Sequence, residues 1–126
     1  MILNAIKSAN EIDSSTLNYL IENLSSLIYD AHFKVAIQAI KYLTEILKIN
    51  PSKIEHMIER LIHKLVIYKS EKKEELSKAS HYALESIIHS YSSDILLPYF
   101  LKCIEGKNAV NSKACALDYI PYLIRE

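Results

Sequence analysis

The sequence predicts an all-α protein, and two observations lead to this prediction. Glycine occurs once and proline three times among 126 residues, too few for the turns of a multi-stranded sheet. Leucine, isoleucine, alanine, lysine, glutamate and serine dominate, and the apolar residues recur at helical spacing. Short breaks separate the periodic segments at even intervals. We therefore expect about seven helices arranged in antiparallel pairs.

Length and charge place the chain among globular domains. Half of its residues are hydrophobic, which predicts one domain over 1–126 with a substantial core. The formal net charge is zero, which argues against nucleic acid as a partner. No apolar run reaches the roughly 18 residues of a membrane span, and the N-terminus does not resemble a signal peptide. We therefore expect no membrane partner and a location in the cytosol or nucleus.

The segment HFKVAIQAIKYLTEILKI at 32–49 is the centre of the predicted fold. Projected as a helix at about 100° per residue, its apolar side chains leave a polar wedge of only about 80°. The wedge holds Lys34, Gln38, Lys41, Glu45 and Lys48. A helix with so wide an apolar face is covered on two sides, as in a stack of helices.

The other elements follow from breaks and capping residues. Asp13, Ser14 or Ser15 is expected to cap the second helix, and Asp30 the third. Asn50 is expected to cap a helix beginning at Pro51, and Gly106 to end the sixth helix. We expect helices at 1–9, 14–29, 31–49, 51–68, 73–91, Ser92–Asp94 to about Glu105, and 108–124.

A repeat relates these helices. Shifting the central helix by about 41 positions aligns Leu43 with Leu84 and Ile46 with Ile87. A two-helix unit of roughly 35–45 residues is the HEAT period, so the finer prediction is a HEAT-repeat α-solenoid. The apolar pattern is still running at Ile124, which leaves open that the domain is a fragment of a longer protein.

The pattern His56-x-x-Glu59-x-x-x-His63 places three metal-ligand types on one helix face. A solvated helix face accounts for it without further assumption, and a metal or pH-sensing site is the alternative. Similarly, Cys103 and Cys115 fit buried apolar positions, with a redox or metal role as the alternative.

The strongest candidate for binding is a lysine stripe on the central helix. Lys34, Lys41 and Lys48 recur every seven residues and span about 21 Å. With Asn50 and Lys53 in the following loop, they form the predicted partner-binding site, which would take an acidic partner surface. Ordinary solvation of an exposed strip is the alternative.

Catalysis is not predicted. The chain lacks a glycine-rich phosphate loop, since Gly106 is its only glycine. His32, His81 and His89 have no serine, cysteine or aspartate at a meaningful spacing. We therefore predict no catalytic residue, no cofactor and no metal.

Nine tyrosines and no tryptophan are an unusual set of aromatic residues. Tyr29, Tyr42, Tyr68, Tyr91 and Tyr122 fall near predicted helix ends. We expect most to lie at the edge of the core with their hydroxyls in water. One or two are candidates for anchoring a partner.

The order of these residues resembles a known family. The run DAHFKVAIQAIKYLTEILKINPSKIEHMIERLIHKLVIYKS and the helices after it resemble the C-terminal TOG-like HEAT domain of CLASP proteins, over roughly 16–124. The matching passages are Ala39–Pro51, Lys64-Leu65, the charged loop Glu71–Glu75, the small-residue helix Ala79–Ile87, and Leu97-Pro98.

This resemblance implies a function. CLASP proteins are microtubule-associated regulators of plus ends, the mitotic spindle and kinetochores, and their C-terminal domain docks partners such as CLIP-type plus-end proteins and in some members supports dimers. Related TOG domains bind tubulin through loops that correspond to Asn10–Asp13, Lys48–Lys53 and Tyr91–Asp94. Because the first loop lacks the tryptophan common in tubulin binders, we expect adaptor docking, with direct tubulin binding or an unrelated HEAT scaffold as alternatives.

Overall fold

The protein is all-helical, as the sequence predicts. The structure, a computed structural model, describes residues 14–30, 32–105 and 110–124. Six α-helices lie in these ranges: α2 (Ser14–Asp30), α3 (Phe33–Ile49), α4 (Ile58–Lys69), α5 (Glu74–Ser90), α6 (Ser93–Ile104) and α7 (Val110–Ile124). The helix expected at 1–9 and the cap expected at Gly106 fall outside the described residues. Within those ranges, no helix has the length and apolarity needed to cross a membrane.

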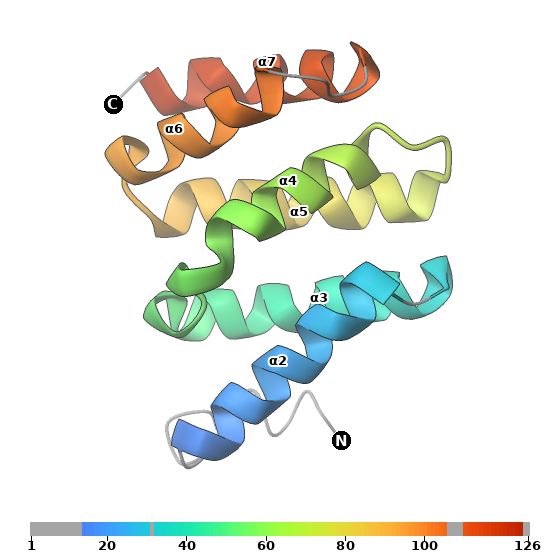
Figure 1. The fold of residues 1–126 in the computed structure, drawn as a ribbon, viewed down its shortest axis with the longest axis vertical. Coiled ribbons are helices and arrows are strands. Elements are labelled where there is room, and N and C mark those ends of the chain that lie inside the picture. The colour runs from blue at the N-terminus through green and yellow to red at the C-terminus, as the bar shows by residue number, and fades with distance from the viewer. Residues whose placement is uncertain (1–13, 31, 106–109, 125–126) are drawn as a thin grey trace.

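Neighbouring helices in the chain pack against each other as pairs. The pairs α2 with α3, α4 with α5, and α6 with α7 share extensive contacts, and α3 also packs against α5 and α4 against α6. Figure 1 shows the three pairs one above another, with α2, α4 and α6 nearer the viewer. The expected covering of the central helix on two sides is confirmed, because α3 lies between α2 and α5.

One apolar core runs through the pairs. Its largest fully buried side chains come from α2, α3, α4 and α6, together with Ile54 between α3 and α4. The polar wedge of α3 faces outward, since Lys34, Gln38, Lys41 and Lys48 are exposed and Glu45 is half-buried. Leu27 of α2 and Val35 of α3 are each 42% exposed, because they lie at the edges of the apolar arcs of their helices.

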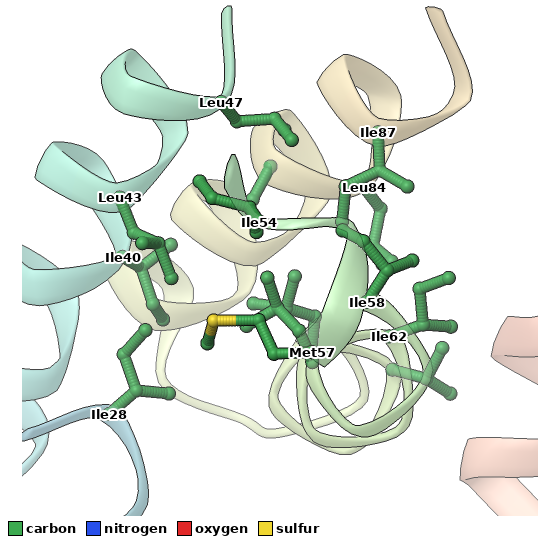
Figure 2. Packing of buried hydrophobic residues seen from close by; sticks show 14 of the residues in the cluster. Ile28, Ile40, Leu43, Leu47, Ile54, Met57, Ile58, Ile62, Leu84 and Ile87 are labelled. Atoms are coloured by element: carbon green, nitrogen blue, oxygen red, sulfur yellow. The ribbon is translucent and has the colours of Figure 1, made fainter. Parts of the chain in front are cut away.

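The segment between α3 and α4 differs from the prediction of one continuous helix at 51–68. It forms two short 3₁₀ turns, η2 (Pro51–Lys53) and η3 (Glu55–Met57), before α4 begins. The amide of Ile54 donates to the Pro51 carbonyl and that of Met57 to the Ile54 carbonyl, both with the i to i+3 pattern of such turns. Figure 2 shows Ile54 and Met57 among buried side chains such as Leu43 and Leu84. The tighter turns thus bring these two residues into the core.

Helix caps also differ from the prediction. His32, not Asp30, caps α3: its Nδ1 accepts from the Lys34 amide, and its carbonyl accepts from the amides of the first turn. Asn50 ends α3 by donating its amide to the Ile46 carbonyl, and its side chain accepts from the Ser52 hydroxyl. Asn50 therefore makes no side-chain cap for the next helix.

Two tyrosine hydroxyls expected in water instead bind backbone carbonyls. Tyr68 at the end of α4 donates to the Ile28 carbonyl near the end of α2, at 2.7 Å. Tyr91 after α5 donates to the Pro51 carbonyl at the start of η2. The Tyr68 bond satisfies a carbonyl in the last turn of α2, where intrahelical partners run out. These two tyrosines therefore tie separate elements together.

Removing a buried side chain at the start of α4 should cost much of the stability. Ile58 is fully buried, so Ile58→Ala is expected to lower the free energy of unfolding by about 2–5 kcal/mol through lost burial and a residual cavity. Ile95→Ala is the matched control, because Ile95 is 38% exposed on α6, and its loss is expected to be about 1 kcal/mol or less. Urea unfolding measures both. Equal losses would place Ile58 outside the core.

The hydrogen bond from the Tyr91 hydroxyl to the Pro51 carbonyl should make the free energy of unfolding fall at alkaline pH. Burial raises the pKa of Tyr91 above its ordinary value near 10. The folded state therefore holds this proton where the unfolded chain has lost it, so its contribution is complete below about pH 10 and is lost above that. Tyr91→Phe is expected to lose about 0.5–1.5 kcal/mol at neutral pH and to decline less above pH 10.

Urea unfolding at neutral pH and at pH values above 10 measures this effect. Tyr19→Phe is the control, because Tyr19 is 70% exposed and its change should leave neutral-pH stability intact. An alkaline decline of the same slope in wild type and Tyr91→Phe would contradict the role given to Tyr91.

Candidate functional site

The lysine stripe predicted from the sequence lies along the outer side of α3. Lys34, Lys41 and Lys48 are all exposed, and they follow one another at seven-residue intervals along a regular helix. Gln38 is exposed between the first two. The structure therefore brings these three lysines onto one surface, as the sequence predicts.

Lys48 differs from the other two lysines because it is engaged by side chains. Its Nζ donates to the Tyr82 hydroxyl on α5 at 2.6 Å, lies 5.2 Å from the centre of that ring, and is 4.0 Å from a Glu45 oxygen. The hydrogen bond to Tyr82, and then the charge of Glu45, raise the pKa of Lys48. Lys48 thus links α3 to α5 more than it offers a charge to a partner.

Lys34 and Lys41, unlike Lys48, make no ion pair with a described residue. Within the residues described, neither has a carboxylate within 4.0 Å of its Nζ. Val35 is partly exposed beside Lys34. This part of α3 therefore presents two uncompensated cations and an apolar contact on a rigid helix.

Asn50 and Lys53 do not join the stripe. Asn50 is half-buried, and its side chain is occupied by the Ser52 hydroxyl at 2.9 Å. Lys53 is half-buried in η2, where it lines a hollow of about 280 Å³ together with Asn18 and Glu22 of α2. Lys53 thus lies toward α2, whereas Lys48 contacts α5. The predicted site is therefore split between two sides of α3.

A second candidate surface, which the sequence did not reveal, crosses α2, α4 and α6. It is a groove of about 530 Å³, and its walls include Tyr29 of α2, Arg60 and Lys64 of α4, and Tyr99 and Lys102 of α6. The signal available in the sequence was the polar face of the helix around Arg60 and Lys64. The tyrosines that complete the groove lie more than thirty positions away, so periodicity within one helix does not reveal it.

The three residues of the histidine–glutamate pattern have separate surroundings. Glu59 pairs with Lys102 of α6 at 2.9 Å, and the Nδ1 of His63 lies 3.9 Å from the Cys103 sulfur. His56 is exposed before α4. Across the described ranges, no group of three histidine, cysteine, aspartate or glutamate residues is placed to hold a metal ion.

Both cysteines are buried free thiols, at positions where small apolar residues were expected. Burial, and then the neighbouring Cys115 and Glu59, raise the pKa of the Cys103 thiol to about 11. Burial also raises the pKa of Cys115. Because the thiolate is the reactive form, both side chains are poor nucleophiles at neutral pH.

A carboxylate, an imidazole and a phenol form a chain between α5 and α7. Glu85 lies 3.2 Å from the Nε2 of His81, whose Nδ1 lies 2.5 Å from the Tyr119 hydroxyl. With a proton on Nε2 facing Glu85, the Nδ1 accepts from Tyr119. Burial raises the pKa of Tyr119, so the phenol stays neutral. The chain therefore joins the second and third helix pairs and does not activate a nucleophile.

Comparison with known proteins leaves the family open. No family model, curated protein or solved structure matches this chain. Family, partner and location therefore stand as proposals.

Proposed function

We propose that this chain is a non-catalytic protein-interaction module built as a short HEAT-like, TOG-like α-solenoid. In such a solenoid, the first helices of successive units stack on one another and so do the second helices. The module would dock an acidic surface of a protein partner along the outer side of α3. The single observation behind the docking surface is the pair of uncompensated, exposed cations Lys34 and Lys41.

The separations between bonded residues support the solenoid. Between α2 and α4, Tyr68 bonds to Ile28, 40 positions away. Between α4 and α6, Lys102 bonds to Glu59, 43 positions away. On the other side, Lys48 bonds to Tyr82 and His81 to Tyr119, over 34 and 38 positions. These separations scatter around 40 residues, near the period of a HEAT unit.

The docking surface suits a partner that lies along a helix. The two free cations are seven residues apart, so about 10 Å of α3 separates them. Because α3 is packed between α2 and α5, its outer side is held rigid and little order is lost on binding. An acidic helix or strand of a partner laid along α3 would meet both charges.

The microtubule part of the proposal is supported by the sequence resemblance alone. A CLASP-like C-terminal domain would dock CLIP-type plus-end proteins, kinetochore proteins or spindle proteins at the cytoskeleton, and a second copy of the chain is a further possible partner. The neutral charge of the chain fits docking to proteins better than binding to nucleic acid.

Charge reversal on α3 tests the docking surface. Lys34→Glu with Lys41→Glu is expected to remove specific partners from a quantitative pull-down with a dividing-cell extract, because an acidic surface is then repelled. Lys72→Glu with Lys78→Glu makes the same charge change at exposed positions elsewhere and should leave the captured set unchanged. Circular dichroism confirms folding. An identical captured set for all three proteins would reject the α3 surface.

Gel filtration with purified tubulin separates adaptor docking from direct tubulin binding. The proposal expects the chain and tubulin to elute separately, because the lysines at the α3–α4 loop are engaged or half-buried. Co-elution at micromolar concentration would replace the adaptor proposal with a tubulin-binding one.

A further inference from the structure

We infer that the groove between α2, α4 and α6 is a second docking site, which takes an extended acidic segment of a partner protein. The groove lies away from the α3 surface of the proposed function and does not depend on it. Its volume is about 530 Å³, and it is bounded by three helices that are fixed by the core. A segment of chain, not a flat protein face, is the shape that enters such a hollow.

The charge of the groove selects an acidic ligand. Of the described residues, three cations, Arg60, Lys64 and Lys102, line it against one carboxylate, Glu59, which gives a net charge of +2 with His63 neutral. The whole chain carries no net charge, so this excess is local. Glu59 is already paired with Lys102 at 2.9 Å. Among the described residues, no carboxylate lies within 4.0 Å of Arg60 or Lys64.

Tyrosine rings hold these two cations in place. The Arg60 guanidinium lies 5.4 Å from the centre of the Tyr29 ring, and the Lys64 ammonium 4.7 Å from that of Tyr68. Cation–π contacts restrain the long side chains without neutralising their charges. Less side-chain freedom is then lost when a ligand binds.

The spacing of the cations sets the spacing of the ligand's acids. Arg60 and Lys64 are one helical turn apart, about 6 Å along α4. In an extended peptide, side chains two residues apart lie on the same side at about 6.6–6.8 Å. Two acidic residues separated by one residue therefore match the two cations in register.

The apolar part of the groove adds a third position. Ile67 lies one turn beyond Lys64 on the same side of α4, and Tyr99 of α6 also lines the groove; both are half-buried. The next same-side residue of an extended segment falls near Ile67. The ligand is thus an acidic–x–acidic–x–apolar segment.

Tyr29 contributes a possible donor. Its hydroxyl is buried in the groove wall and has no hydrogen-bond partner among the described residues. A buried hydroxyl without a partner is unfavourable, so a ligand carboxylate that accepts from it would gain affinity. Tyr29→Phe should leave the stability of the free protein unchanged or slightly higher and should weaken ligand binding.

Fluorescence anisotropy with a labelled peptide tests the site. The peptide is about twelve residues long, with two glutamates separated by one serine and a leucine two positions further on. The comparison peptide has the same composition with adjacent glutamates. The first is expected to bind more tightly, and its binding should weaken as salt is raised.

Variants assign the binding to the groove. Arg60→Glu with Lys64→Glu is expected to weaken binding about tenfold or more, and the same change at Lys34 and Lys41 on α3 should not alter it. Glu59→Gln is expected to tighten binding, because it removes a negative charge from the groove and raises the charge of its described residues to +3. Arg60→Gln with Lys64→Gln replaces the reversal if that variant fails to fold.

Four results would overturn the inference. Equal affinity for the two peptides would show that the spacing of the two glutamates does not matter. Unchanged binding by Arg60→Glu with Lys64→Glu would show that the peptide does not bind in the groove. Tighter binding of a thymidine oligonucleotide of equal charge would make nucleic acid the ligand. Loss of binding at Lys34 and Lys41 instead would move the peptide to the α3 surface.

Discussion

Burial of one side of α4 is the constraint on which the rest of the structure depends. This helix packs against α5, α6 and α7, and so joins the second helix pair to the third. Its buried residues are Ile58, Leu61, Ile62, Leu65 and Val66. Full burial of such a side chain is worth about 1.5–3 kcal/mol, so α4 cannot rotate without losing most of that contribution. The direction of its polar side, and with it the groove, is fixed by the same contacts.

The sequence was sufficient to predict where helices lie but not how they begin and end. Apolar periodicity locates α2, α3 and α5 closely, because a buried stripe needs that period whatever its neighbours are. The η2–η3 segment was missed because Tyr91, forty positions away, binds the Pro51 carbonyl and helps to hold the chain there. The exposure of Val35 could not be predicted for a similar reason: a residue at the edge of an apolar arc is buried only if a neighbouring helix covers it. Both errors come from contacts distant in sequence.

The two candidate surfaces differ in the same respect. The α3 stripe lies on one helix, so its seven-residue spacing is visible in the sequence, and the structure removes only Asn50 and Lys53 from it. The groove is assembled from α2, α4 and α6, and the cation–π contact of Arg60 with Tyr29 spans the first two pairs. Prediction of such a site requires knowing that α4 lies beside both α2 and α6. The pairing of Glu59 with Lys102 depends on the same contact between α4 and α6.

Zero net charge has a consequence for how either surface would find a partner. Charges separated by more than about 8–10 Å are largely screened at physiological salt, so local clusters act only on a partner that is already close. The balancing acidic residues of the chain include the pairs Glu74 with Lys78 and Glu85 with His81 on α5, away from the groove. Long-range steering is therefore weak, and discrimination must come from fit after contact. A groove with restrained cations in register with alternate side chains supplies that fit, whereas the two lysines on α3 select mainly for charge.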